Sequence, residues 1–215
     1  MLARIRLRVP DRPGSLGRVA SAIGTASGDI AGVDVLATEA GSALDDVVVR
    51  VRDVGHLDAV LTALTGVPGV GVDGVHHPVP PVPGHADLQL VAQVLAQPGR
   101  SLQTLVDGAP AALGVDWAAI VHTEIGRDEL DVVATGSGAP AALAGTLVGP
   151  FRLRTFRLEP AGGPPHAAAL VPLEGCPLGL LLGRAGGLEF HSRELWRLGQ
   201  LGAVVGPCLA VSAPA

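Results

Sequence analysis

Apolar and polar residues alternate strictly from Arg4 to Val9, where the chain reads Arg-Ile-Arg-Leu-Arg-Val. Such alternation predicts a half-buried β-strand in which every second residue faces a core. The period then changes, because apolar residues recur three and four positions apart from Leu16 to Ile23. That spacing predicts an amphipathic helix beginning near Ser15.

The same two periods repeat through the rest of the first half of the chain. They predict further strands at residues 29–39, 47–52 and 69–75, and a second helix over residues 57–64. The order of elements is therefore β-α-β-β-α-β. This is the ferredoxin-like plan of an α+β fold, in which the first and third strands are central and adjacent.

Five arginines fall on the face of this predicted sheet that points away from the helices: Arg4, Arg6, Arg8, Arg50 and Arg52. An anion site is one interpretation, and a solvated face or one covered by acidic residues of another domain is the simpler one. The same plan occurs in RNA-binding RRM domains, which stack bases on aromatic side chains. Because the first 85 residues contain no Phe, Tyr, Trp or Lys, RNA binding is not expected.

Between the first strand and the first helix lies the loop Asp11-Arg12-Pro13-Gly14-Ser15-Leu16. Gly14 removes a side chain where the backbone turns, and Pro13 stiffens the approach. The start of the helix offers free N–H groups that suit a carboxylate, while Asp11 and Asp29 can receive an ammonium group. The loop is therefore a candidate seat for a free amino acid.

With Gly28-Asp29-Ile30 at the second strand, the segment from Arg4 to His76 resembles an ACT domain. ACT domains are regulatory modules that bind amino acids, typically at an interface between two paired domains. The resemblance implies a homodimer in which the loop of one copy faces the start of the second strand of the other. It also implies the ligand-binding residues, which are Asp11, Arg12, Gly14, Ser15, Leu16, Asp29 and Ile30.

The chain departs from this family near the loop. Some amino-acid-binding members carry Asn at the positions of Asp11 and Asp29, and this chain contains no Asn. Ionised Asp accepts hydrogen bonds but donates none, so the choice of ligand can differ. Some members also place a His just before the loop, where this chain has Val9 and Pro10. Two alternatives stay open, namely Asp11 as a simple turn former and a domain that only mediates dimerisation.

Periodicity breaks down after His77, where four prolines fall within six residues. Such a stretch predicts a stiff, extended connector between domains. We therefore predict an ACT domain at residues 1–77, a linker at residues 78–84 and a second domain at residues 85–215. Neighbouring His76 and His77 point to opposite sides of an extended chain, so a shared metal ion is not expected.

In the second half, helical spacing covers residues 88–95 and 102–113, and apolar runs predict hairpins at residues 117–134 and 167–183. Residues 135–166 are rich in Gly, Ala and Pro, and no helix or strand is assigned to them. Facing an anion is one interpretation of the arginines in this segment, and a solvated strand edge is the simpler one; they are Arg152, Arg154 and Arg157. A final helix is predicted with Ser192 as its N-cap.

The run Pro177-Leu178-Gly179-Leu180-Leu181-Leu182-Gly183, followed by Phe190, Glu194 and Leu195, resembles the closing strand and helix of a GAF domain. GAF domains are antiparallel sheets with flanking helices that bind small ligands or mediate dimerisation. The chain lacks the Asn and Lys of the cyclic-nucleotide binders. The resemblance therefore implies a degenerate GAF-like domain used for packing or dimerisation, in which His122 and His166 are structural.

Composition narrows the available chemistry. Without Lys, the 215-residue chain has no Schiff-base amine and no phosphate-loop lysine. Its net charge of −5 argues against nucleic-acid partners. Cys176 and Cys208 match no metal spacing and are expected to be free thiols in a reducing cytoplasm. Charged residues interrupt the N-terminal region, so neither a signal peptide nor a membrane partner is expected.

No nucleophile with a base, paired-carboxylate site or metal-ligand spacing is evident in the sequence. Ser137 lacks the glycine pattern of a nucleophile elbow, and the acidic cluster Glu124, Asp128, Glu129 and Asp131 is expected to be solvated. The sequence predicts a non-enzymatic, cytoplasmic regulatory protein without a cofactor, which senses a free amino acid at a dimer interface. The alternative is a ligand-free dimerisation or protein-interaction module.

Overall fold

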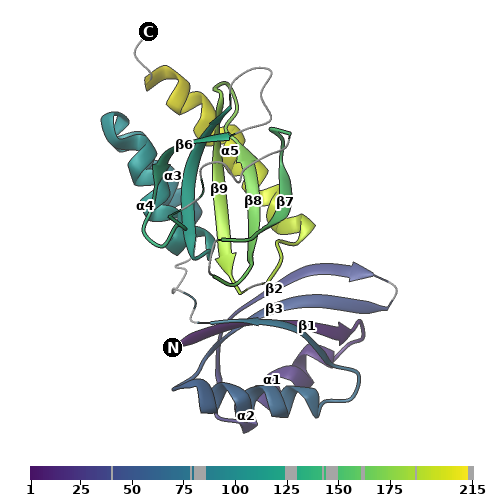
Figure 1. Ribbon diagram of the computed structural model, residues 1–215. Helices are drawn as coiled ribbons and strands as arrows, with labels where there is room; N and C mark the ends of the chain where they lie inside the picture. The colour runs from purple at the N-terminus through teal and green to yellow at the C-terminus, as the bar shows by residue number, and fades with distance from the viewer. Residues whose placement is uncertain are drawn as a thin grey trace. The chain divides into compact units, whose positions relative to one another are not determined.

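The computed structural model describes residues 1–212 except 40, 78, 80–85, 124–129, 142, 144–149, 161–162 and 187 (Figure 1). The chain divides into two compact units, Met1–Val79 and Pro80–Ala215. Most of the linker predicted at residues 78–84 lies outside the described residues, as does the predicted turn at residues 126–128. The first unit contains a four-stranded sheet and the second a five-stranded sheet.

The elements of the first unit are β1 (Leu2–Pro10), α1 (Ser15–Thr25), β2 (Asp29–Glu39), β3 (Ser42–Arg50), α2 (Val54–Thr65) and β4 (Gly71–His76). The antiparallel strands have the order β2-β3-β1-β4, so the predicted ferredoxin-like plan with β1 and β3 as central neighbours is confirmed. Strand β3 covers residues 42–50 rather than 47–52. Its early part pairs with β1 although it carries Asp45 and Asp46 in place of apolar residues.

Both helices of the first unit pack on one face of its sheet (Figure 1). Val19 and Ile23 of α1 and Leu57 of α2 meet alternate residues of β1 and β3 in one apolar core. Ile5 and Leu7 are fully buried in that core. The alternation that predicts β1 therefore also identifies the face of the sheet that the helices cover.

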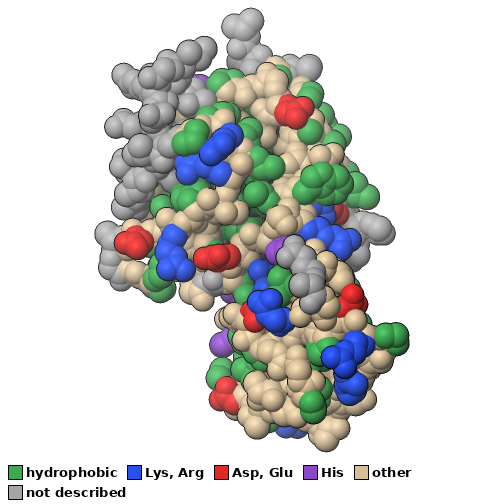
Figure 2. All heavy atoms as spheres, turned by 90° about the vertical axis from the view of Figure 1, so that its right-hand side faces the viewer, with side chains coloured by type: hydrophobic (Ala, Val, Ile, Leu, Met, Phe, Trp, Pro, Cys, Tyr) green, Lys and Arg blue, Asp and Glu red, His purple; other side chains and the backbone are tan. Residues whose placement is uncertain are grey.

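On the other face of this sheet, arginines are matched by aspartates of the same unit. The pairs are Arg6–Asp46 at 2.8 Å, Arg8–Asp73 at 2.6 Å and Arg50–Asp29 at 3.4 Å. These matched charges count against an anion site, and the aspartates come from the same unit rather than from another domain as predicted. On the face of the molecule shown in Figure 2, arginines and acidic residues also lie interspersed rather than in one basic patch.

The elements of the second unit are α3 (Ala86–Ala96), the short 3-10 helix η1 (Pro98–Arg100), α4 (Ser101–Leu113), β5 (Trp117–Thr123), β6 (Leu130–Thr135), β7 (Arg154–Leu158), β8 (His166–Pro172), β9 (Leu178–Ala185) and α5 (Ser192–Ser212). Both predicted hairpins, β5–β6 and β8–β9, are present in an antiparallel sheet of order β6-β5-β9-β8-β7. Strand β7 lies within the segment to which the sequence assigned no helix or strand, and it pairs with β8 at the sheet edge.

Apolar side chains fill both faces of this second sheet. Helices α3, α4 and α5 pack on one face, against residues such as Ile120 and Leu182. A smaller cluster around Trp117, Leu170 and Leu181 lies on the opposite face. The prediction of an antiparallel sheet with flanking helices is therefore confirmed.

The start of helix α5 differs from the prediction. The helix begins at Ser192 itself, so Ser192 is not the residue that precedes it. The His191 N–H donates to the Glu194 carboxylate at 2.9 Å, and the Leu195 N–H donates to the His191 carbonyl at 2.9 Å. His191 Nδ1 accepts from the Arg193 N–H at 3.3 Å, which is the contact that the prediction assigned to Ser192, and Glu194 reaches back to His191 as in a capping box.

Trp117 is fully buried, and its indole N–H donates to His166 Nδ1 at 2.9 Å. Burial lowers the pKa of His166 and outweighs the opposite effect of the nearby Asp116 charge. A neutral His166 accepts the indole proton, which is the structural role predicted for it. Gly183 lies directly against the indole ring, where the Cβ of any other residue would collide with Trp117.

Candidate functional site

The loop after β1 turns tightly into helix α1. The Asp11 N–H donates to the Gly41 carbonyl at 2.9 Å, and the Ser15 N–H donates to the Arg12 carbonyl at 3.1 Å. Gly14 adopts a φ of 84°, which glycine reaches without strain and other residues reach only at a cost. A Cβ on Gly14 would meet no atom within 4 Å among the described residues, so the space over the turn is open.

Helix α1 begins beside this open space without a side-chain cap. Among the described residues, no hydrogen bond is found for the N–H groups of Leu16 and Gly17, which are donors of the first turn. Ser15 is buried, and the Arg18 guanidinium donates to its hydroxyl at 3.0 Å. The helix terminus and Arg18 together place positive potential at the loop, which suits a carboxylate.

Asp45 is a buried carboxylate that the sequence analysis did not single out. It pairs with Leu7 across β1 and β3, and cross-strand partners project to the same face, which is the one covered by the helices. Asp45 is 3% exposed, and its Oδ1 has no hydrogen-bond partner in the described part of the chain. Burial, followed by the charges of Asp46 and Asp11, raises the pKa of Asp45. The influence of Asp11 places Asp45 in the electrostatic environment of the loop.

The two remaining predicted site residues lie at the other end of the sheet. Asp29 pairs with Arg50, and Arg50 with Leu2, whereas the loop follows Pro10 at the opposite end of β1. Eight residue steps of about 3.3 Å separate those ends by roughly 26 Å. Asp29 is exposed, and Ile30 packs against the core. One copy of the chain therefore brings together Asp11, Arg12, Gly14, Ser15 and Leu16, and does not bring Asp29 and Ile30 to them.

Sequence reasoning missed two residues near the loop. Arg18 lies three positions after Ser15, a spacing that places both on one side of the first helical turn. Asp45 lies next to Asp46 where the apolar pattern of β3 is interrupted. Two adjacent carboxylates at the start of a strand are a signal that could have drawn attention to this position.

The family comparison settles the identity of the first unit. The model of the ACT domain matches residues 1–72. The first unit carries an ACT domain. ACT domains are in general regulatory modules that bind small molecules, so the regulatory class predicted from the loop and the start of β2 is confirmed at that level. A comparison with curated proteins gave no match.

Similar solved structures include two GAF domains. One comes from Acinetobacter phosphoenolpyruvate-protein phosphotransferase, is 14% identical, covers 59% of this chain and 94% of that chain, and has a TM-score of 0.42. The other is assigned to a sensor histidine kinase from Pseudomonas syringae pv. tomato, with 19% identity, coverages of 56% and 83%, and a TM-score of 0.39.

A third similar structure is an unknown protein from Galdieria sulphuraria, which is 15% identical and has a TM-score of 0.28. It covers 96% of this chain and 91% of that chain.

Other candidate chemistry is limited in the part of the chain that the structure describes. Within those ranges, no group of three or more His, Cys, Asp and Glu side chains is arranged to hold a metal ion. Cys176 and Cys208 are free thiols. The described helices include none that is both long and apolar enough to cross a membrane. Of the predicted acidic cluster, Glu124, Asp128 and Glu129 lie outside the described residues.

Proposed function

We propose that the chain is a cytoplasmic, non-enzymatic regulator whose ACT domain binds a free amino acid between two copies. The observation that carries the proposal is the separation of the predicted site into two halves. The loop at Asp11–Leu16 and the segment at Asp29 and Ile30 lie at opposite ends of one sheet. A ligand that contacts both halves requires a second copy to supply the missing one.

The edge strand β2 supports such a pairing. It lies at the end of the strand order, and its Val33 and Val35 are 43% and 40% exposed. An edge strand with exposed apolar side chains is a template for another strand. Two copies of β2 that pair antiparallel about a two-fold axis would bring Asp29 of one copy toward the loop end of the other.

The charges around the loop suit the two ends of an amino acid. The first-turn N–H groups of α1 and the Arg18 guanidinium favour the ligand carboxylate. Asp11 of one copy and Asp29 of the other would accept hydrogen bonds from its ammonium group. A free amino acid has roughly ten non-hydrogen atoms, and about 0.6–0.9 kcal/mol per atom corresponds to a dissociation constant of roughly micromolar to tens of micromolar. That range suits a sensor of metabolite pools.

The test is a thermal-shift screen of the full chain against the twenty amino acids. At a ligand concentration of a hundred times the dissociation constant, binding stabilises the folded state by about 2.7 kcal/mol. Gly14→Ala places a methyl group in the open space of the loop, so we expect at least a tenfold loss of affinity. Gly175→Ala is the matched control, because Gly175 has a φ of 82° and an equally open Cβ position, in the second unit.

Two results would count against the proposal. One is the absence of a shift with every amino acid, and the other is an equal response in the two glycine variants. Equal responses would mean that the ligand binds away from the loop.

A ligand-free interaction module is the second candidate function. It is favoured by the apolar side chains that are exposed on helices of the second unit: Leu88, Leu95, Trp196 and Val204. Exposed apolar side chains of this size mark protein interfaces when they form a continuous patch. Sedimentation that shows a stable assembly, together with no thermal response to any amino acid, would favour this second function over the first.

A further inference from the structure

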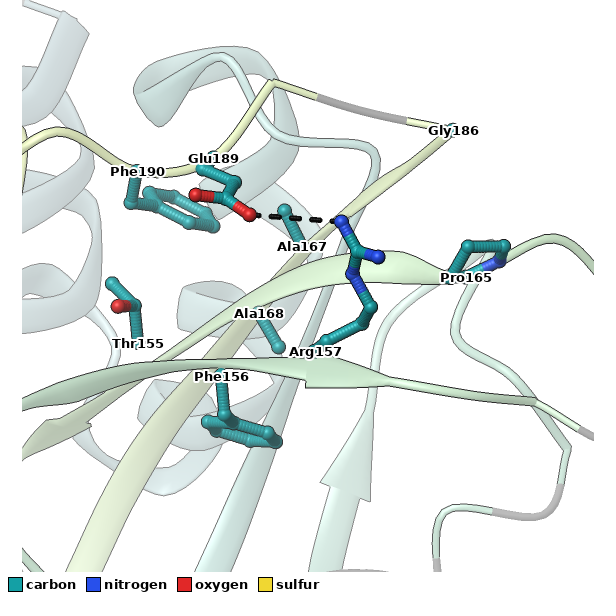
Figure 3. Close-up of a pocket in the computed structure, with 9 residues that line it drawn as sticks. All are labelled: Thr155, Phe156, Arg157, Pro165, Ala167, Ala168, Gly186, Glu189 and Phe190. Carbon is teal, nitrogen blue, oxygen red and sulfur yellow. Dashed lines mark ion pairs between the residues drawn. The ribbon is translucent and has the colours of Figure 1, made fainter.

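A cavity of about 320 Å³ opens in the second unit between strand β7 and the segment that leads into helix α5 (Figure 3). Its size lies at the lower end of the range of roughly 300–1,000 Å³ that is usual for small-molecule sites. The side chains of Thr155 and Arg157 come from β7, Ala167 from β8, and Glu189 and Phe190 from the segment before α5. The cavity therefore lies in a different unit from the ACT loop.

The floor of the cavity is made by small side chains of the sheet. Thr155 and Arg157 pair with Ala169 and Ala167 across β7 and β8 and project to the same face. Phe156 points to the other side of β7, as Figure 3 shows, and packs in the cluster around Trp117. Alternation along β7 and β8 therefore leaves the Thr155 hydroxyl, the Arg157 guanidinium and the Ala167 methyl group facing the cavity.

The opposite wall is held in place by a buried cation. The Arg184 guanidinium lies 4.2 Å from the centre of the Phe190 ring and donates to Glu194 at 2.7 Å. Arg184 also donates to the Gly114 carbonyl at 3.2 Å and is 1% exposed. These contacts fix the Phe190 ring relative to β9 and the start of α5. A wall that is already positioned costs a ligand little ordering entropy.

Two opposite charges meet at the cavity. Arg157 Nη2 lies 3.6 Å from Glu189 Oε1, and the two side chains are 65% and 80% exposed. An exposed pair at this distance contributes little to folding, so it can separate around a guest at small cost. Glu189 repels a ligand that carries only a negative charge, and Arg157 repels one that carries only a positive charge. A molecule with both charges can pair with both residues.

We propose that this cavity is a second ligand site, which takes a small zwitterion of the α-amino-acid class with a compact apolar side chain. The ligand carboxylate pairs with Arg157, whose planar donors suit it, and the ammonium group pairs with Glu189. The side chain contacts Phe190 and Ala167. This site does not rest on the proposed function of the ACT domain, because no residue is shared between the two.

Calorimetry on the Gly14→Ala variant of the 215-residue chain tests the site, since that variant should weaken binding at the proposed loop site at least tenfold. The probes are L-valine, isovalerate, which lacks the amino group, and isobutylamine, which lacks the carboxylate. We expect L-valine to bind and each analogue to bind at least tenfold more weakly. Arg157→Gln and Glu189→Gln should each weaken L-valine binding at least tenfold, with unchanged thermal unfolding of the free protein.

Arg152→Gln is the matched control, because it removes the same charge from an exposed position outside the cavity. The proposal is overturned if L-valine does not bind the Gly14→Ala variant, or if Arg157→Gln binds it as well as Arg152→Gln does. It is also overturned if isovalerate binds as tightly as L-valine, since the ammonium group would then have no role. If the proposed ACT site were wrong, the wild-type protein and the Gly14→Ala variant would instead bind L-valine equally.

Discussion

The buried ion pair between Arg184 and Glu194 offers a sharp test of what holds the second unit together. Arg184 is 1% exposed, whereas Glu194 is 17% exposed. Replacing Glu194 by Ala leaves the Arg184 charge buried with only the Gly114 carbonyl and the Phe190 ring as described neighbours. It also removes the acceptor of the His191 N–H. The change therefore leaves a buried cation without its carboxylate partner, which costs more than the loss of a single contact.

Breaking a buried pair by removing one partner costs about 3–5 kcal/mol, and the partial exposure of Glu194 favours the lower end of that range. We therefore expect Glu194→Ala to reduce the free energy of unfolding by about 3 kcal/mol. Urea denaturation followed by tryptophan fluorescence is the assay. The chain has two tryptophans, Trp117 and Trp196, and both lie in the second unit, so the signal reports on that unit.

Two further variants separate the causes. Glu159→Ala removes an exposed carboxylate and should change stability by no more than about 0.5 kcal/mol. The double variant Arg184→Met with Glu194→Leu removes both charges and should recover at least half of the loss. If Glu194→Ala lowers the free energy of unfolding no more than Glu159→Ala does, the idea that Arg184 is left as an unpaired buried charge is refuted. If the double variant is less stable than Glu194→Ala, the loss comes from packing instead.

Two pH-dependent predictions follow from buried titratable groups. The pKa of Asp45 is raised in the folded state above its ordinary 3.8, so stability falls as the pH rises through the window above 3.8. Asp45→Asn removes that loss, and its stability relative to wild type should grow between about pH 4 and pH 7 in urea titrations; a constant difference would contradict this. The pKa of His166 is lowered below 6.5, so the second unit should lose stability as the pH falls below 6.5. His166→Gln should show less of this loss in fluorescence-monitored unfolding, and an unchanged pH profile would exclude His166 as its source.

The elements that the sequence predicts well are those with an unbroken period. Strand β1 and helices α1 and α5 carry apolar residues at regular spacing, and each contributes to a core. Strand β7 was missed because its apolar residues, Phe156 and Leu158, stand between stretches rich in Gly and Pro. Strand β3 was shortened because Asp45 and Asp46 interrupt its apolar run, although backbone pairing with β1 continues through them.

Long-range contacts explain what sequence reasoning could not find. The loop residues from Asp11 to Leu16 are contiguous, so their grouping follows from the sequence alone. Arg184 of β9 contacts Phe190 of the segment before α5. The periodic spacing of apolar residues in the sequence gives no sign of this contact. The cavity wall and the buried Asp45 both depend on such pairings. The sequence therefore predicts the grouping of the loop residues Asp11 to Leu16 better than it predicts the contacts around that loop or around the cavity.

The placement of Asp11 and Asp29 at opposite ends of one sheet has a genetic consequence in the proposed dimer. Each of its two sites would combine the loop of one subunit with the β2 start of the other. An allele damaged at Gly14 and a second allele damaged at Asp29, expressed together, would form mixed dimers. In those dimers both lesions fall in the same site, and the other site is entirely wild type. Each mixed dimer would thus keep one of its two sites intact, which neither defective allele provides alone.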